Sequence, residues 1–138
     1  VSIIRPPMVY GRSCPGNYKK LRLLALKLPV FPLVENERSF IYVENLAYFV
    51  WNIISENKEG VFMPMDSQRE STDTMAKFIC SANNKEIKFS PLFGKIVKKI
   101  PLNSLKKAFG SLYYRNDIAE MVSFTGFQEA INYTEKKF

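Results

Sequence analysis

Arg38 is the side chain whose type and position point most clearly to chemistry. It lies between the acidic stretch Glu35–Glu37 and the apolar stretch Phe40–Val43, at the edge of a segment that we expect to be buried. A guanidinium presents a planar fork that suits phosphate oxygens, and a nearby helix start adds a favourable dipole. The competing interpretation is an ion pair with Glu35 or Glu37. The residues alone leave both roles open.

A basic run precedes this arginine. It comprises Arg12, Lys19, Lys20, Arg22 and Lys27, with no acidic residue among them. Such a run is either a solvated helix face or a patch that attracts a phosphorylated ligand to a loop and a helix start. The chain carries 20 Lys and Arg against 13 Asp and Glu, but it shows no RNA-recognition motif with the required aromatic residues. The alternative function is a basic, noncatalytic module that binds RNA or an acidic partner through Lys19, Lys20 and Arg22.

Several catalytic systems are excluded by composition and spacing. The chain has no histidine, which removes Ser-His-Asp and Cys-His nucleophiles and the nitrogen ligands of a zinc site. Gly11 and Gly16 have the spacing of a phosphate loop, but Asn17 stands where that loop needs lysine. Tyr133 and Lys137 have the spacing of a catalytic Tyr-Lys pair, on a C-terminal helix that we expect to be solvated. We therefore expect no catalytic residue and no metal site in this chain.

The composition describes one domain that can bury a core. The 138 residues are 46% hydrophobic and 14% aromatic, which excludes disorder as the main description. No window of about 18 apolar residues is present, so we expect no membrane span. The two cysteines, Cys14 and Cys80, indicate a reducing compartment and a cytoplasmic location.

Short strands and helices alternate along the chain and predict an α/β fold with an incomplete sheet. Apolar spacing predicts helices over 18–28, 43–54, 72–79, 91–100, 102–109 and 127–135. Extended segments are expected over 1–4, 38–42, 60–63 and 85–89.

Three local expectations follow from the pattern. Asn17 should cap the first helix, and Ser71 or Thr72 should cap the third. The helix over 43–54 is apolar around so much of its circumference that it should be packed between other elements. Gly60–Met63 reads as a buried strand that ends at Pro64.

The ordered motifs resemble the C-terminal half of NAD-dependent epimerases and dehydratases, the extended short-chain dehydrogenases that include the UDP-galactose 4-epimerases. The most specific motifs are Arg5-Pro-Pro-Met-Val-Tyr-Gly11, Asn17 before a helix, and Arg38-Ser-Phe-Ile-Tyr-Val-Glu-Asn-Leu-Ala47. Weaker matches at Gly60–Met63, Ser71–Thr72 and Phe127–Ile131 follow the family's order. The resemblance covers nearly the whole chain and implies the C-terminal part of a Rossmann-type fold, with a small mixed sheet and several helices.

The resemblance also implies site residues. Pro6 and Pro7 would line the nicotinamide, and Met8 would shape the sugar site where UDP-hexose epimerases commonly have asparagine. Asn17 and Arg38 would hold the diphosphate of a nucleotide sugar. Asn45 stands where the family usually has aspartate and should have a structural, helix-capping role.

By the same resemblance, residues 1–138 form one substrate-binding segment, and an N-terminal dinucleotide-binding domain lies outside this chain. The parent enzyme would exchange hydride between NAD and a nucleotide sugar, such as a UDP-hexose, with a tyrosine base from that domain. It would be an epimerase, dehydratase or reductase, and it could be a homodimer. The isolated chain should be inactive, and an open strand at Val1–Ile4 should favour self-association.

Overall fold

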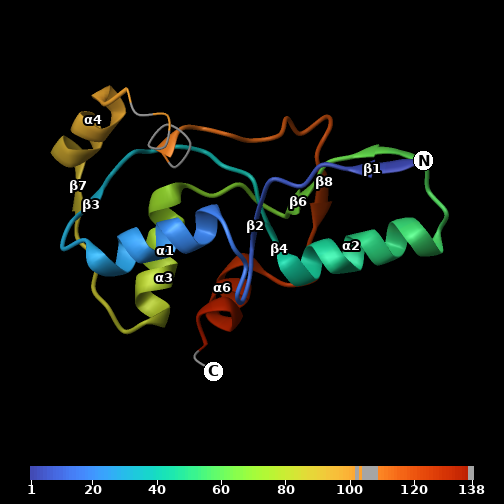
Figure 1. The fold of residues 1–138 in the computed structure, drawn as a ribbon, viewed down its shortest axis with the longest axis horizontal. Coiled ribbons are helices and arrows are strands. Elements are labelled where there is room, and N and C mark those ends of the chain that lie inside the picture. Colours follow the sequence, from blue (N-terminus) through green and yellow to red (C-terminus); the bar gives the residue numbers. More distant parts are fainter. Residues whose placement is uncertain (102, 104–108, 137–138) are drawn as a thin grey trace.

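The computed structural model describes residues 1–101, 103 and 109–136, in which short strands and helices alternate (Figure 1). The strands are β1 (Ser2–Ile4), β2 (Met8–Tyr10), β3 (Phe31–Pro32), β4 (Phe40–Tyr42), β5 (Gly60–Phe62), β6 (Pro64–Asp66), β7 (Phe89–Ser90) and β8 (Glu120–Val122). The helices are α1 (Asn17–Lys27), α2 (Val43–Ser55), α3 (Thr72–Ala82), α4 (Pro91–Lys99) and α6 (Phe127–Glu135). Within these residues, no helix combines the length and the apolar character that a membrane crossing requires. The helix expected over 102–109 falls largely outside the described residues.

The named strands pair side by side in parallel. The pairs are β1 with β5, β2 with β4, β3 with β7, and β6 with β8. Outside these strands, Arg38 forms an antiparallel bridge with Glu70 and a parallel bridge with Leu112. Parallel neighbours need crossover connections: α1 lies in the connection from β2 to β4, and α1 and α2 both lie in the connection from β1 to β5. This arrangement confirms the α/β class that the alternating pattern predicts.

Two apolar clusters form the core. The larger one joins β2, β4 and the helices α1, α3 and α6 through fully buried side chains such as Tyr10, Phe40 and Ile79. The smaller one packs Phe49 and Ile53 of α2 against the strands. In Figure 1 the helices α1, α3 and α6 that carry the larger cluster lie at the left and centre of the molecule, and α2 with β1 extends to the right. The right-hand part therefore has the thinner core.

The helix ends are satisfied by side chains near and far in the sequence. The Ser71 hydroxyl accepts a hydrogen bond from the Thr74 backbone N–H at 3.0 Å, which confirms the expected cap of α3. At the end of α1, the Lys85 ammonium donates to the carbonyls of Ala25, Leu26 and Leu28 at 2.7–2.9 Å. The same ammonium lies at the negative, C-terminal end of the α1 dipole, which further stabilises the helix.

The expected cap at Asn17 is wrong by one residue. Asn17 is the first helical residue, and Gly16 occupies the cap position with φ of 100°. A side chain is strained in that region, so glycine takes the position and α1 begins without a side-chain cap.

The predicted burial of the strand at Gly60–Met63 is wrong. Val61 in β5 is 52% exposed, whereas all three residues of the next strand, Pro64–Asp66, are buried. Pro64 thus begins the buried strand instead of ending one. Proline is tolerated as the first residue of a strand, because the missing N–H there need not join the ladder.

The predicted enclosure of α2 is also wrong. One side of the helix packs through Asn45, Phe49 and Ile53, but Trp51 is 63% exposed and Ile54 is 71% exposed. Apolar character all around a helix indicates contacts on every side, and the described residues supply contacts on one side only.

Gly94 sets how closely α4 approaches β3, and Gly94→Ala should destabilise the chain. A Cβ at this position would lie 1.8 Å from the Leu33 carbonyl oxygen, which belongs to the backbone and cannot rotate away. We expect a loss of about 1–3 kcal/mol in the free energy of unfolding, as for other overpacked sites. Urea unfolding measures this loss. Lys95→Ala is the control on the same helix, because Lys95 is exposed and alanine suits a helix interior; equal losses in the two variants would contradict the steric explanation.

Candidate functional site

The parallel register brings four of the five predicted site residues to one end of the β2–β4 pair. Met8 lies opposite Phe40, so Pro6 and Pro7, which precede β2, lie at the same end as Arg38, which precedes β4. Pro6 is exposed, and Pro7 and Met8 are half-buried. This end of the pair therefore brings three apolar residues and one buried arginine together along the two strands.

Arg38 is held firmly and is only 4% exposed. Its backbone exchanges two hydrogen bonds with Glu70, at 3.0 and 3.1 Å, and its Nη1 donates to the Gly110 carbonyl at 3.4 Å. Burial lowers the pKa of Arg38, because desolvation disfavours the charged form. The guanidinium nevertheless stays protonated at neutral pH, since the ordinary pKa of arginine is so high. Of the two glutamates considered as ion-pair partners of Arg38, Glu37 lies 3.5 Å from Arg69.

A segment from the C-terminal third closes over this end of the pair. The Ser39 N–H donates to the Leu112 carbonyl, and the Tyr114 N–H donates to the Ser39 hydroxyl, both at 3.0 Å. The Tyr114 hydroxyl donates to the Arg5 carbonyl at 2.9 Å. Arg69 binds the same segment, with Nη2 2.7 Å from the Tyr114 carbonyl and its guanidinium carbon 4.4 Å from the Tyr113 ring centroid. Sequence reasoning missed Arg69 and Tyr114, because no local pattern links residues about 45 to 109 positions apart.

Asn17 enters from a separate element. It lies exposed at the first turn of α1, after the loop that follows the other end of β2. Its exposed amide and the uncapped α1 terminus are compatible with anion binding, but the geometry of the described residues does not by itself join it to Arg38.

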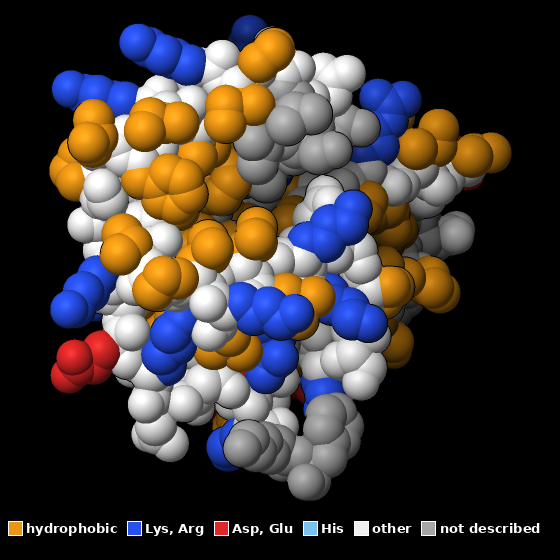
Figure 2. All heavy atoms as spheres, turned by 60° about the vertical axis from the view of Figure 1, so that its left-hand side comes forward, with side chains coloured by type: hydrophobic (Ala, Val, Ile, Leu, Met, Phe, Trp, Pro, Cys, Tyr) orange, Lys and Arg blue, Asp and Glu red, His pale blue; other side chains and the backbone are white. Residues whose placement is uncertain are grey.

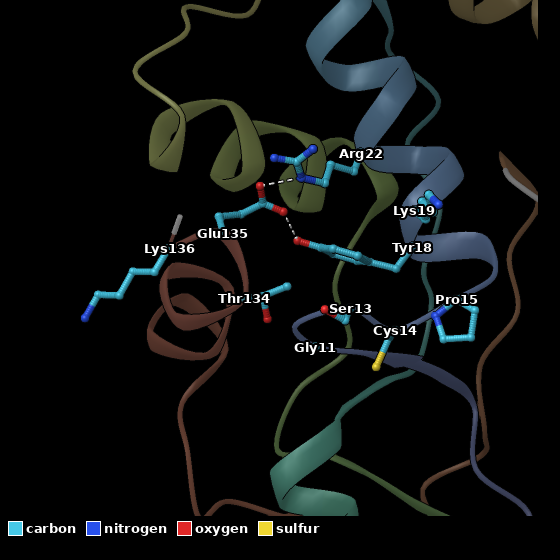
Figure 3. Close-up of a pocket in the computed structure, with 10 residues that line it drawn as sticks. All are labelled: Gly11, Ser13, Cys14, Pro15, Tyr18, Lys19, Arg22, Thr134, Glu135 and Lys136. Carbon is cyan, nitrogen blue, oxygen red and sulfur yellow. Dashed lines mark hydrogen bonds and ion pairs between the residues drawn. The ribbon is translucent and has the colours of Figure 1, made fainter. Parts of the chain in front are cut away.

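A pocket of about 470 Å³ lies beside this helix start (Figure 3). It is lined by Gly11, Ser13, Cys14, Pro15, Tyr18, Lys19, Arg22, Thr134, Glu135 and Lys136. Tyr18 and Arg22 of α1 point toward Glu135 at the end of α6, whereas Lys136 points away from them. Glu135 accepts from the Tyr18 hydroxyl at 2.6 Å, from Arg22 Nε at 2.7 Å and from Asn83 Nδ2 at 2.7 Å. The cluster therefore ties α1, α3 and α6 together.

The titratable groups of this pocket are not poised for catalysis. Burial, with the hydrogen bond to Glu135 as a further cause, raises the pKa of Tyr18 above its ordinary range. Burial also raises the pKa of the Cys14 thiol. Both groups remain protonated at neutral pH, so neither is a ready base or nucleophile.

The basic run is only partly available to a ligand. Figure 2 shows Lys and Arg spread over the side that carries α1 and α4, with hydrophobic side chains gathered toward its upper left. Lys19 and Lys20 are exposed, but Arg22 is bound to the buried Glu135. The alternative RNA-binding or acidic-partner site thus loses one of its three expected cations to a structural pair.

A buried carboxylate organises the strands behind the site. Asp66, at the end of β6, accepts from the Tyr10 hydroxyl at 2.7 Å, the Tyr42 N–H at 3.1 Å and Asn45 Nδ2 at 2.8 Å. Asn45 also exchanges two hydrogen bonds with the backbone of Thr125, at 2.9 and 3.0 Å. The structural role expected for Asn45 is confirmed, but it connects α2 to distant segments instead of capping the helix.

Comparisons with known proteins agree with this geometry. Over 99% of its length the chain is 29% identical to the UDP-glucose 4-epimerase of Vibrio cholerae, of which the match covers 40%. Its fold is similar to that of a dTDP-4-dehydrorhamnose reductase from Clostridium acetobutylicum, with a TM-score of 0.68, 15% identity, and coverage of 96% of this chain and 47% of that one. It is also similar to the UDP-glucose 4-epimerase of Thermus thermophilus in complex with NAD, with a TM-score of 0.61, 16% identity, and coverage of 97% and 45%.

These likenesses confirm the resemblance to the NAD-dependent epimerases and dehydratases and the Rossmann-type α/β class. No model of a protein family matches the chain. The chain spans less than half the length of these three relatives.

Proposed function

We propose that this chain is the substrate-binding portion of a nucleotide-sugar epimerase, dehydratase or reductase, because it is similar to NAD-dependent epimerases and dehydratases over nearly its whole length. In this proposal residues 1–138 form one segment, and a separate N-terminal domain binds the dinucleotide. The observation that carries the proposal is the buried Arg38, which precedes β4 at the same end of the β2–β4 pair as Pro6, Pro7 and Met8.

Arg38 would bind the diphosphate. A rigid, largely desolvated guanidinium forms stronger charge-assisted hydrogen bonds than one in water, and its fork matches two phosphate oxygens. Asn17, exposed at the uncapped start of α1, would donate a further hydrogen bond to the same group. Holding the diphosphate orients the attached sugar, which lowers the entropic cost of the reaction.

Pro6, Pro7 and Met8 would form the wall between the sugar and the cofactor. Their side chains have no charge and no hydrogen-bond donor. Such side chains suit contact with the flat face of the nicotinamide ring better than contact with the phosphates of the dinucleotide. NAD, when bound by the other domain, supplies hydride acceptance and return. The residues of this chain would keep water away and set the sugar's orientation. A UDP-hexose substrate, a homodimeric parent and a cytoplasmic location remain predictions.

Arg38→Ala should weaken the binding of UDP by about 10- to 100-fold, which corresponds to the loss of charged hydrogen bonds worth about 1.5–3 kcal/mol. Calorimetric titration of UDP into the protein that contains this chain and its dinucleotide-binding domain measures the loss. Arg38→Lys should lose nearly as much, because lysine keeps the charge but not the fork.

Two controls make this test specific. Arg115→Ala removes an exposed arginine that pairs with Asp117, and it should leave the affinity for UDP unchanged. A Lys19→Ala/Lys20→Ala variant should also bind UDP normally. If that double variant lost binding while Arg38→Ala, still folded by circular dichroism, kept it, the basic module would replace the proposed function.

A further inference from the structure

Helix α4 presents an exposed apolar pair on its outer side. Its inner side packs on β3 and on the larger apolar cluster through the buried Gly94 and Val97. Leu92 and Ile96, four positions apart on the opposite side, are 70% and 50% exposed. A single exposed leucine is ordinary, but two large aliphatic side chains aligned on one helix face form a contact surface.

The same side of α4 carries cations. Lys95 and Lys99 follow Leu92 by three and seven positions, so helical geometry places them beside the apolar pair, and Lys98 flanks them. All three lysines are exposed, and within the residues that the structure describes none of them forms an ion pair. Their charge is therefore available to an anionic partner.

The lysines of α4 belong to a longer stretch that has no acidic residue. Between Glu86 and Asp117 the sequence contains seven Lys and Arg and no Asp or Glu. The formal net charge of the whole chain is also +7, so the cations outside this stretch are balanced in number by the acidic residues. The excess positive charge of the chain is thus concentrated in the part of the sequence that contains α4.

Helix α4 also lies at an extremity of the molecule. Figure 1 shows it at the upper left, away from the β2–β4 pair and its Arg38 end. On the side of the molecule that carries α4, Figure 2 shows hydrophobic side chains gathered at the upper left with Lys or Arg beside them. A face in this position can meet an extended surface without any rearrangement of the core.

We propose that this side of α4 adsorbs to the surface of an anionic lipid bilayer. We call it the α4 face, and it comprises Leu92, Lys95, Ile96, Lys98 and Lys99. The two aliphatic side chains enter the boundary between headgroups and acyl chains, and the lysines pair with headgroup phosphates while their stems lie along the apolar surface. Adsorption of this kind needs no helix that crosses the bilayer. It is independent of nucleotide-sugar binding at Arg38.

The α4 face fits a bilayer better than it fits a protein groove or RNA. A groove that binds a helix reads anchors at several successive turns, whereas the nine residues of α4 supply two exposed aliphatic anchors. RNA recognition relies on exposed aromatic side chains for base stacking, and the exposed apolar residues of this face are aliphatic. A bilayer accepts a short apolar insertion and a broad distribution of positive charge at the same time.

Pelleting with sucrose-loaded vesicles, done on the protein that contains this chain, tests the proposal. The vesicles are phosphatidylcholine alone, or phosphatidylcholine with about 30% phosphatidylglycerol to supply the negative charge. We expect binding to the anionic vesicles only, and loss of most of it between about 0.1 M and about 0.5 M NaCl, because salt screens the lysines. Absence of binding to the anionic vesicles overturns the proposal. If the protein then bound poly-glutamate, an acidic protein would be the partner instead.

Two lysines of the α4 face have a matched control on α1. Lys95→Gln/Lys99→Gln should weaken vesicle binding by about 25-fold, because each lysine near an anionic surface contributes about fivefold. Lys19→Gln/Lys20→Gln removes the same charge at two exposed positions of α1 and should weaken binding by less than about threefold. Equal losses in the two variants would show attraction by net charge alone and would overturn the proposal.

The apolar pair is tested by a loss and by a gain of affinity. Leu92→Ser/Ile96→Ser should weaken vesicle binding at least about tenfold, since the two aliphatic side chains no longer leave water. Leu92→Trp should tighten it by about threefold, because tryptophan favours the membrane interface, and a misfolded variant would not gain affinity. Unchanged binding in the serine variant, or weaker binding in the tryptophan variant, contradicts insertion of the α4 face.

Discussion

Asp66→Ala should lower the free energy of unfolding by about 3–5 kcal/mol, because three buried donors lose their acceptor and each costs about 1–3 kcal/mol when left unsatisfied. The donors are the Tyr10 hydroxyl, the Tyr42 N–H and Asn45 Nδ2, and both Tyr10 and Asn45 are fully buried. Burial raises the pKa of Tyr10, so its hydroxyl stays a donor throughout the accessible pH range. Equilibrium urea unfolding followed by circular dichroism measures the change.

Asp117→Ala is the control for this prediction. Asp117 is an exposed aspartate that pairs with the exposed Arg115, and surface pairs of this kind contribute about 0–1 kcal/mol. We call Asp66 and its three donors the Asp66 hub. If Asp66→Ala lost no more free energy of unfolding than Asp117→Ala, water would have to reach the three donors. The Asp66 hub would then not hold β2, β4 and α2 together.

The Asp66 hub also predicts a pH dependence. Burial raises the pKa of Asp66 above its ordinary 3.8, although its three donors oppose the shift. The folded state therefore favours the neutral carboxyl, whose contribution to stability is present below pH 3.8 and is lost as pH rises through the folded-state pKa. Asp66→Asn cannot ionise, so its deficit relative to the unchanged chain should shrink between about pH 4 and pH 7. A deficit that grows over this range would show that the donors outweigh burial.

Glu135→Ala should cost about 2–4 kcal/mol, slightly less than the removal of a partner from a fully buried ion pair. The Glu135 side chain has no exposed surface, and it accepts from Tyr18, Arg22 and Asn83. The cost is reduced because the Arg22 side chain is 36% exposed, so water can solvate it after the change. Urea unfolding of the variant gives the magnitude.

Glu135→Gln separates charge from hydrogen bonding at this site. The amide keeps the size and one acceptor oxygen, so its loss should be about half that of the alanine variant. Glu129→Ala is the control on the same helix, because Glu129 is exposed and accepts only from Tyr133, at 3.1 Å, among the described hydrogen bonds. A loss at Glu129 equal to that at Glu135 would mean that helix propensity, and not the buried cluster, is being measured.

Local features of this chain were predictable because their causes lie within a few residues. Helical apolar spacing located α2 and α6 almost to the residue, and the Ser71 cap follows from a side chain that reaches only three positions along the chain. The resemblance of the Arg5–Gly11 and Arg38–Ala47 motifs to the NAD-dependent epimerases and dehydratases likewise needed no tertiary information, because each motif is continuous in sequence.

Tertiary structure alone decided which surfaces are covered and which charged groups are paired. Apolar composition could not distinguish the exposed Val61 from the buried Pro64–Asp66, since burial depends on which strand lies beside which. Glu135 meets Tyr18 across 117 positions and Asp66 meets Tyr10 across 56, and no local pattern records contacts at such separations. The sequence shows that Arg38 is a candidate phosphate-binding arginine, but it does not show that this arginine is buried. Its burial depends on strand pairing and on the segment at Leu112. Desolvation is a property of the packed neighbours and not of the residue itself.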